Sequence, residues 1–179
     1  AALLLAHPEL KANIAGISLM GGGLAHGNWT PAAEFNILAD PEAADVVFRS
    51  GLPITMAGLD VTEQAWFSPE EFAALPDTPV GRFARAATAG PMRKNMARGA
   101  GGLCLHDVCP VLYLTHPELF TGRQAGVHVE TRGTVTYAKT VTDLDSDAKF
   151  PERNVFVVLG VDRAGFAAHI TEALSSYAG

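Results

Sequence analysis

Apolar and polar positions along the chain follow two different periods, which predicts an alternation of strands and helices. Short apolar runs that end near glycine or polar residues are typical of buried strands, and they occur at residues 14–20, 52–62 and 154–161. Stretches with helical spacing lie around them, at residues 1–11, 40–51, 68–75, 105–120 and 162–177. This order favours one α/β domain over residues 1–179, with a mainly parallel, open, Rossmann-like sheet flanked by helices.

Residues that favour helix ends support several of these helices. Asp40 is predicted to cap a helix whose first residue is Pro41, and Gly51 lies just past its end. Ser68 and Glu71 have the spacing of a capping box, in which the two side chains bond each other's backbone. These signals fix where two of the helices begin.

Two further segments differ from the rest in composition and periodicity. Residues 88–102 are glycine-rich, basic and poorly periodic, which predicts a mobile loop. Residues 126–144 are rich in Val and Thr with near alternation, which predicts an antiparallel β-ribbon near the C-terminal end. The ribbon is expected as an excursion from the parallel sheet.

Composition narrows the class of protein and its partners. The chain has 179 residues, of which 48% are apolar, so it can bury a hydrophobic core. Its net charge is −6 and no run of Lys or Arg occurs, which argues against a nucleic-acid or anionic membrane partner. No apolar run reaches the length of a membrane span. The two cysteines, Cys104 and Cys109, match no metal-ligand spacing, which favours a reducing cytoplasm.

The stretch GNWTPAAEFNILADPEAA, residues 27–44, places three polar side chains among residues typical of a core. If AEFNI is extended, Glu34 and Asn36 point to one side, and Asn28 can fold back beside them. The carboxylate accepts hydrogen bonds, and each amide can both donate and accept them, which suits neighbouring hydroxyl groups, so a sugar is a reasonable ligand. An ordinary polar loop is the alternative reading.

Other candidates are weaker. The glycines of LMGGG, residues 19–23, lack a complete phosphate-binding pattern and fit a tight turn or a close approach of backbone to a ligand. His106 can donate a proton and Asp107 can bind a metal ion or a hydroxyl, although Asp107 can equally cap the next helix. Asp60 and Thr62 can line a strand end, or serve a turn. The remaining histidines show no partner spacing and are interpreted as structural or surface residues: His7, His26, His116, His128 and His169.

Taken together, residues 19–65 closely resemble the inosine-uridine preferring nucleoside hydrolase family, above all in the run NxTPxAEFNxxxDPEAA. The segments LHDVCPVLYLTHPELF and VETRGTVTYAKTVTD resemble later parts of the same family. The resemblance implies a nucleoside hydrolase-like fold and cleavage of ribonucleosides to ribose and free base. Within the family, the residue pattern is most similar to that of bacterial enzymes that accept both purine and pyrimidine nucleosides.

The resemblance also implies roles for the polar stretch. Asn28 and Glu34 match residues that hold the ribose 5′-hydroxyl, and Asn36 matches one on the 2′ and 3′ side. Met20 matches a methionine that packs against the ribose. These four residues are therefore the expected substrate-binding set.

The resemblance implies a second set from the later segment. His106 matches a histidine proposed to protonate the departing base, which makes it the expected catalytic residue. Asp107 matches a carboxylate that binds both Ca²⁺ and a ribose hydroxyl. The loop at residues 88–102 matches a segment that closes over the nucleobase. Members of the family commonly form homo-oligomers, so the resemblance also implies a homo-oligomer here.

One departure from the family pattern changes the expectation for this chain. The acidic segment DxDxGxDD, which supplies the aspartate base and most calcium ligands, is absent from residues 1–179. We therefore expect the C-terminal part of a single hydrolase domain, without its first strands, without a complete calcium site and with little activity. The alternatives are a degenerate module that binds ribose or another protein and, resting on MGGG alone, a phosphate-binding regulatory domain.

Overall fold

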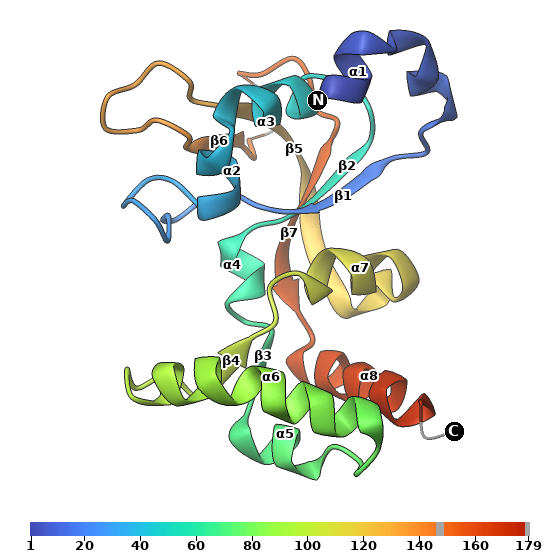
Figure 1. Ribbon diagram of the computed structural model, residues 1–179. Coiled ribbons are helices and arrows are strands. Elements are labelled where there is room, and N and C mark those ends of the chain that lie inside the picture. Colours follow the sequence, from blue (N-terminus) through green and yellow to red (C-terminus); the bar gives the residue numbers. More distant parts are fainter. Residues whose placement is uncertain (146–148, 178–179) are drawn as a thin grey trace.

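The computed structural model describes residues 1–145 and 149–177, and a five-stranded sheet runs through its centre (Figure 1). The strand order is β1-β2-β7-β5-β6. The strands are β1 (Ile17–Met20), β2 (Ile54–Ala57), β5 (Phe120–Val129), β6 (Thr140–Asp143) and β7 (Val155–Val161). β1, β2 and β7 are parallel, and in the register Ala57 pairs with both Met20 and Val158. The prediction of an α/β fold with a mainly parallel core is confirmed.

The predicted antiparallel ribbon is present as β5 and β6, but it is not an excursion. β5 begins at Phe120, well before the predicted start of the ribbon, and pairs antiparallel with β7 as far as Ala125. It then pairs with β6 from Gly126 onward. The ribbon therefore continues the main sheet, because one long strand serves both neighbours.

Helices cover both faces of the sheet (Figure 1). One face carries α1 (Ala2–Ala6), α2 (Phe35–Ala39) and α3 (Pro41–Phe48), and the other carries α4 (Leu59–Thr62), α7 (Val108–Thr115) and α8 (Arg163–Ser176). Beside α8 lie α5 (Pro69–Ala74), α6 (Pro79–Met96) and a small antiparallel sheet of β3 (Trp66–Phe67) and β4 (Leu103–Cys104). Among the described helices, none combines the length and the apolar character needed to cross a bilayer.

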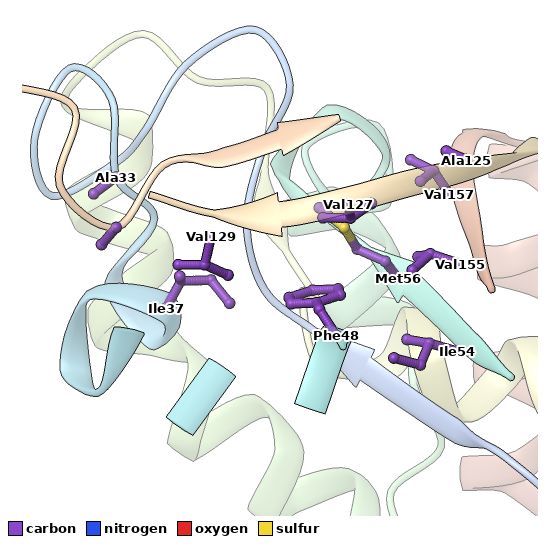
Figure 2. Packing of buried hydrophobic residues seen from close by; sticks show 11 residues of the cluster. Ala33, Ile37, Phe48, Ile54, Met56, Ala125, Val127, Val129, Val155 and Val157 are labelled. Carbon is purple, nitrogen blue, oxygen red and sulfur yellow. The ribbon is translucent and has the colours of Figure 1, made fainter. Parts of the chain in front are cut away.

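The core divides into clusters because alternate residues of each strand point to opposite faces. Ile54 and Met56 of β2 pack with Phe48 of α3 on one face. Ala57 and Val158 face the other way and pack beneath α7 and α8. Figure 2 shows the first cluster, in which the Met56 side chain lies among Val127, Val155 and Val157. Met56 is wholly buried. Met56 also lies directly under the loop that follows β1, because its Cε atom would meet a Cβ placed on Gly22 at 2.7 Å.

The predicted helix over residues 1–11 is wrong in extent. α1 ends at Ala6, and a 3₁₀ turn follows over residues 8–13. Pro8 has no N–H for an intrahelical bond, and its ring disfavours helical geometry at His7, which has φ −135° and ψ 64°. The same local structure ends α7 at Thr115, so the predicted helix over residues 105–120 is also too long.

The predicted mobile loop over residues 88–102 is wrong up to residue 96. α6 is an 18-residue helix that continues to Met96 in spite of Pro91, so the non-helical segment starts only at Ala97. Thr78 caps its start by accepting the Gly81 N–H at 3.0 Å. The predicted caps at Asp40 and Ser68 are confirmed by side-chain hydrogen bonds to the first turn of each helix, and Asp162 caps α8 in the same way.

Met56 offers a test of this core. Met56→Ala would leave a cavity at a wholly buried position. We therefore expect the free energy of unfolding to fall by about 2–5 kcal/mol. Urea unfolding followed by circular dichroism measures the change. The matched control is Met96→Ala, because Met96 is 44% exposed on α6 and should lose little stability. Equal losses for the two variants would contradict the placement of the core.

Candidate active site at the carboxyl edge of the sheet

The loop that follows β1 is held from three directions. The N–H groups of the glycines at 21–23 donate in order to the carbonyl of Ala57, the carboxylate of Glu34 and the hydroxyl of Thr140, at 3.3, 3.0 and 3.0 Å. Gly22 has φ +76°, and an added Cβ would lie 2.7 Å from Thr140. The glycines are therefore required by a crowded turn. Their amides are already bonded within the protein, which removes the support for a phosphate loop.

Glu34 joins this loop to the start of α2. The side chain is only 2% exposed, and its carboxylate accepts the Asn36 N–H at 2.9 Å and the Ile37 N–H at 3.2 Å, besides that of Gly22. These bonds satisfy amides that the first turn of a helix leaves unpaired. The prediction that AEFNI is extended is thus wrong, because Glu34 is the N-cap and Asn36 lies in the helix.

Two asparagines complete this side of the site. The Oδ1 atom of Asn28 accepts the Phe35 N–H at 2.9 Å. The amide nitrogen of Asn36 lies 3.4 Å from the Met20 carbonyl and 3.2 Å from its sulfur. Both asparagine side chains are exposed, and within residues 1–145 and 149–177 no further partner is found for their remaining amide atoms. Met20, Asn28, Glu34 and Asn36 thus form one bonded group with free donor and acceptor atoms.

The far side of the glycine loop is fixed by two residues from distant segments. Asp60 accepts the N–H groups of Leu24 and Ala25 at 2.6 and 3.0 Å. The Lys139 ammonium donates to the carbonyls of Gly23 and Leu24 at 2.8 and 2.7 Å. Burial lowers the pKa of Lys139, and the nearby Asp60 carboxylate opposes that shift. Asp60 therefore holds a loop, and sequence reasoning missed Lys139 because its partners lie more than a hundred positions away.

His106 is tied to the same loop through α4. Its Nδ1 atom lies 2.7 Å from the hydroxyl of Thr62, which is wholly buried in α4. The first residue of α4, Leu59, donates its N–H to the Gly22 carbonyl at 2.9 Å. A continuous set of contacts therefore links His106 to the glycine loop and, through Gly22, to Glu34.

Asp107 lies toward the same edge because of the direction of α7. The C-terminal end of α7, at Tyr113 and Leu114, lines a cavity of about 420 Å³. Ile17, at the amino end of β1, lines the same cavity. The start of α7 therefore points toward the carboxyl ends of β1 and β2. Asp107 is exposed, does not cap α7 with its side chain and has no hydrogen-bond partner in the described part of the chain. The capping interpretation of Asp107 is wrong, and its carboxylate is available to a ligand.

The six predicted site residues thus approach one edge of the sheet from opposite faces. Met20, Asn28, Glu34 and Asn36 belong to the face covered by α2 and α3, and His106 and Asp107 to the face covered by α7 (Figure 1). The space beyond the carboxyl ends of parallel strands is where open α/β sheets bind their ligands. Both groups therefore lie toward the edge at which sheets of this kind bind ligands.

A complete calcium site does not fit the described residues. Ca²⁺ requires about 6–8 oxygen ligands. The carboxylates of Glu34 and Asp60 are engaged by backbone N–H groups, which leaves Asp107 as a free carboxylate at this edge. Two carboxylate oxygens fall well short of the required number, so Asp107 can be one ligand of such an ion but not its whole site.

Comparison with known proteins gives a consistent result. The family model described as inosine-uridine preferring nucleoside hydrolase matches residues 1–168. A pyrimidine-specific ribonucleoside hydrolase, RihA, from Shewanella woodyi is 44% identical over 181 residues, which cover 99% of this chain and 58% of that protein. The RihA protein of Salmonella enteritidis is likewise 44% identical, with the same coverage of 99% and 58%.

Solved structures agree with the sequence relatives. A purine-preferring ribonucleoside hydrolase from Gardnerella vaginalis superposes with a TM-score of 0.89 at 36% identity, over 99% of this chain and 57% of that one. The plant nucleoside hydrolase PpNRh1 gives a TM-score of 0.89 at 26% identity, over 98% and 58%. The chain therefore spans somewhat more than half the length of the proteins it matches.

The buried carboxylate of Glu34 generates a prediction. Glu34→Gln replaces one acceptor oxygen by an amide that must face a backbone N–H, so we expect a loss of about 1–3 kcal/mol in the free energy of unfolding. Chemical denaturation measures it. Glu63→Gln is the control, because the Glu63 side chain is exposed and bonds His26 at the surface. A Glu34→Gln protein as stable as the control would show that the cap and the loop do not depend on this carboxylate.

Proposed function

Because the chain belongs to the inosine-uridine preferring nucleoside hydrolase family, we propose that it contributes the ribose-binding and leaving-group side of a ribonucleoside hydrolase. The reaction is hydrolysis of the N-glycosidic bond to ribose and free base. The observation that carries the proposal is that the glycine loop after β1 is bonded on one side to Glu34 and, on the other, to α4, whose Thr62 holds His106.

The ribose hydroxyls are bound by the first group. Asn28 and Asn36 each use one amide atom to bond the protein, which fixes the side chain and leaves the other atom for a hydroxyl. Glu34 and Asn28 are assigned to the 5′-hydroxyl. Because Glu34 is buried, its main role is to position both asparagines. Met20 offers an apolar contact to the ring. Such contacts hold the sugar as it flattens toward an oxocarbenium-like transition state.

His106 protonates the departing base. With Nδ1 bonded to the Thr62 hydroxyl, the ring is fixed and Nε2 is left to face the leaving group. A positioned acid of this kind contributes about 10²–10⁴-fold to the rate. Asp107 binds a ribose hydroxyl and would supply one oxygen ligand to Ca²⁺. The described residues do not provide the remaining ligands of that ion.

Further properties follow from the same assignment. Both purine and pyrimidine ribonucleosides are proposed as substrates, since relatives with each preference in their names match the chain. A cytoplasmic location is supported by two unpaired thiols, Cys104 and Cys109. Homo-oligomers are supported by Val111 and Leu114 on α7, which are 64% and 69% exposed.

A chimera tests the proposed roles most sharply. Residues 1–179 would replace the matched 58% of the Shewanella woodyi relative, which keeps the remainder of that enzyme. We expect the chimera to release ribose from inosine and uridine, and His106→Gln to lower kcat by about 10²–10⁴-fold.

The matched control for the chimera is His7→Gln, because His7 is exposed and lies outside the site. A chimera that folds and binds ribose without turnover would instead favour a degenerate binding module. Unchanged kcat in His106→Gln would contradict the role given to His106.

The chain by itself, without the remainder of a relative, provides a separate prediction. Residues 1–179 alone should release no ribose from inosine or uridine, with added Ca²⁺ or with a chelator, because Asp107 cannot complete a calcium site. A reducing-sugar assay over hours measures it. Chelator-sensitive release that disappears in Asp107→Ala would contradict the claim and would mean that other residues, or a second copy, complete the site.

A further inference from the structure

Three potential metal ligands meet away from the candidate active site. His116 and Glu118 flank Pro117 at the short turn η2 (Pro117–Leu119), and His169 projects from α8. One ligand atom from each lies within 4.8 Å of the other two. No hydrogen bond joins this group to the six residues of the candidate active site in the part of the chain that the structure describes. We propose that His116, Glu118 and His169 bind a divalent transition-metal ion, with Zn²⁺ as the ion of best fit.

Half of this site is built by local sequence. The motif His-Pro-Glu-Leu occurs twice, at residues 7–10 and 116–119. In both copies the histidine ends a helix with nearly the same backbone angles, φ −135° with ψ 64° or 61°, and a 3₁₀ turn follows. In both copies Nδ1 of the histidine lies 3.1 Å from Oε1 of the glutamate. The His-Glu pair is therefore a property of the motif itself.

Only the second copy gains a further ligand from the fold. The carbonyl of Leu119 accepts the Asp162 N–H at 2.7 Å, which holds η2 against the start of α8. His169 then stacks on His116 with ring centroids 3.9 Å apart and planes 24° from parallel. Glu172 lies 3.9 Å from His169 and is a possible additional oxygen ligand. The first copy, at His7, acquires no second histidine in the described structure.

The donor types point to zinc. Two imidazoles and one carboxylate are a ligand set that Zn²⁺ takes in proteins, with a water in the fourth position. Donor atoms about 2.0–2.1 Å from a tetrahedral ion are about 3.3 Å apart, close to the observed 3.1 Å of His116 and Glu118. Stacked rings aim their nitrogens nearly parallel, so the His169 ring must tilt toward the ion. His169 is about one-third exposed, at 32%, which leaves room for that movement.

The same donor set separates this site from the calcium chemistry of the proposed function. Ca²⁺ and Mg²⁺ prefer oxygen ligands and gain little from imidazole. A bound zinc ion would fasten η2, at the end of α7, to α8, and so stabilise the folded chain. The site is thus independent of whether the chain hydrolyses nucleosides.

Zinc binding by the metal-free, untagged 179-residue chain tests the proposal. We expect isothermal titration with Zn²⁺ to show one saturable site, and metal analysis after dialysis to find one zinc ion per chain. His169→Gln and Glu118→Gln should each weaken binding by at least about tenfold, since even the loss of groups that only orient a ligand costs about 10–100-fold. Free zinc at a hundred times Kd should raise Tm by about 5–10 °C.

The repeated motif supplies the control. His7→Gln removes the same kind of residue from the first copy, where no second histidine is available, and should leave zinc affinity unchanged. Titration with Ca²⁺ should give no comparable binding. Absence of saturable zinc binding, or wild-type affinity in both His169→Gln and Glu118→Gln while circular dichroism shows them folded, would overturn the proposal. Equal losses in His7→Gln and His169→Gln would also overturn it.

Discussion

The buried carboxylate of Glu34 is the interaction on which the candidate active site depends. It accepts N–H groups from the glycine loop after β1 and from the first turn of α2, and so fixes two segments relative to each other. The Asn36 side chain points from α2 toward Met20, and the Asn28 side chain accepts the Phe35 N–H. Without this carboxylate, buried amides on both sides would lack partners, and the asparagines would lose their fixed positions. The group that the family resemblance assigns to the ribose thus also assembles the surface proposed to bind it.

The two faces of the sheet make different contributions to function. In the proposed function, the α2 face supplies amide groups for hydroxyl recognition, whereas the α7 face supplies a proton donor and a free carboxylate. Both are anchored to the same glycine loop, on one side by Glu34 and on the other by α4 and Asp60. The loop has no spare amides of its own, so its role is to hold the two groups in register. The zinc site proposed at His116 lies outside this arrangement and would act on stability alone.

Local chemistry explains which features the sequence could predict. The caps at Asp40 and Ser68 involve only neighbouring residues, so their spacing was sufficient to predict them. The full length of α6 could not be inferred, because glycines and Pro91 weaken its pattern while packing and the Thr78 cap preserve it.

Contacts between distant segments explain most of what was missed at the site. Lys139 bonds Gly23 across 116 positions, and no local pattern marks it. The sequence likewise predicts only a structural or surface role for His169, because it is the fold that brings this residue to His116. The roles of Asn28, Asn36 and His106 came from the family resemblance, while the structure explains how their side chains are held.

The most direct test of the account is a ¹⁵N-resolved NMR titration of the chain with ribose, following the side-chain amide signals of asparagine. We expect saturable shifts of the Asn28 and Asn36 side-chain amides, which face the proposed ribose position, and of the Gly22 N–H, because it bonds the Glu34 carboxylate beside them. Asn13 and Asn95 lie elsewhere and should not respond. Shifts confined to residues away from the carboxyl edge of β1, or none at saturating ribose, would contradict the claim that this edge is a ribose site.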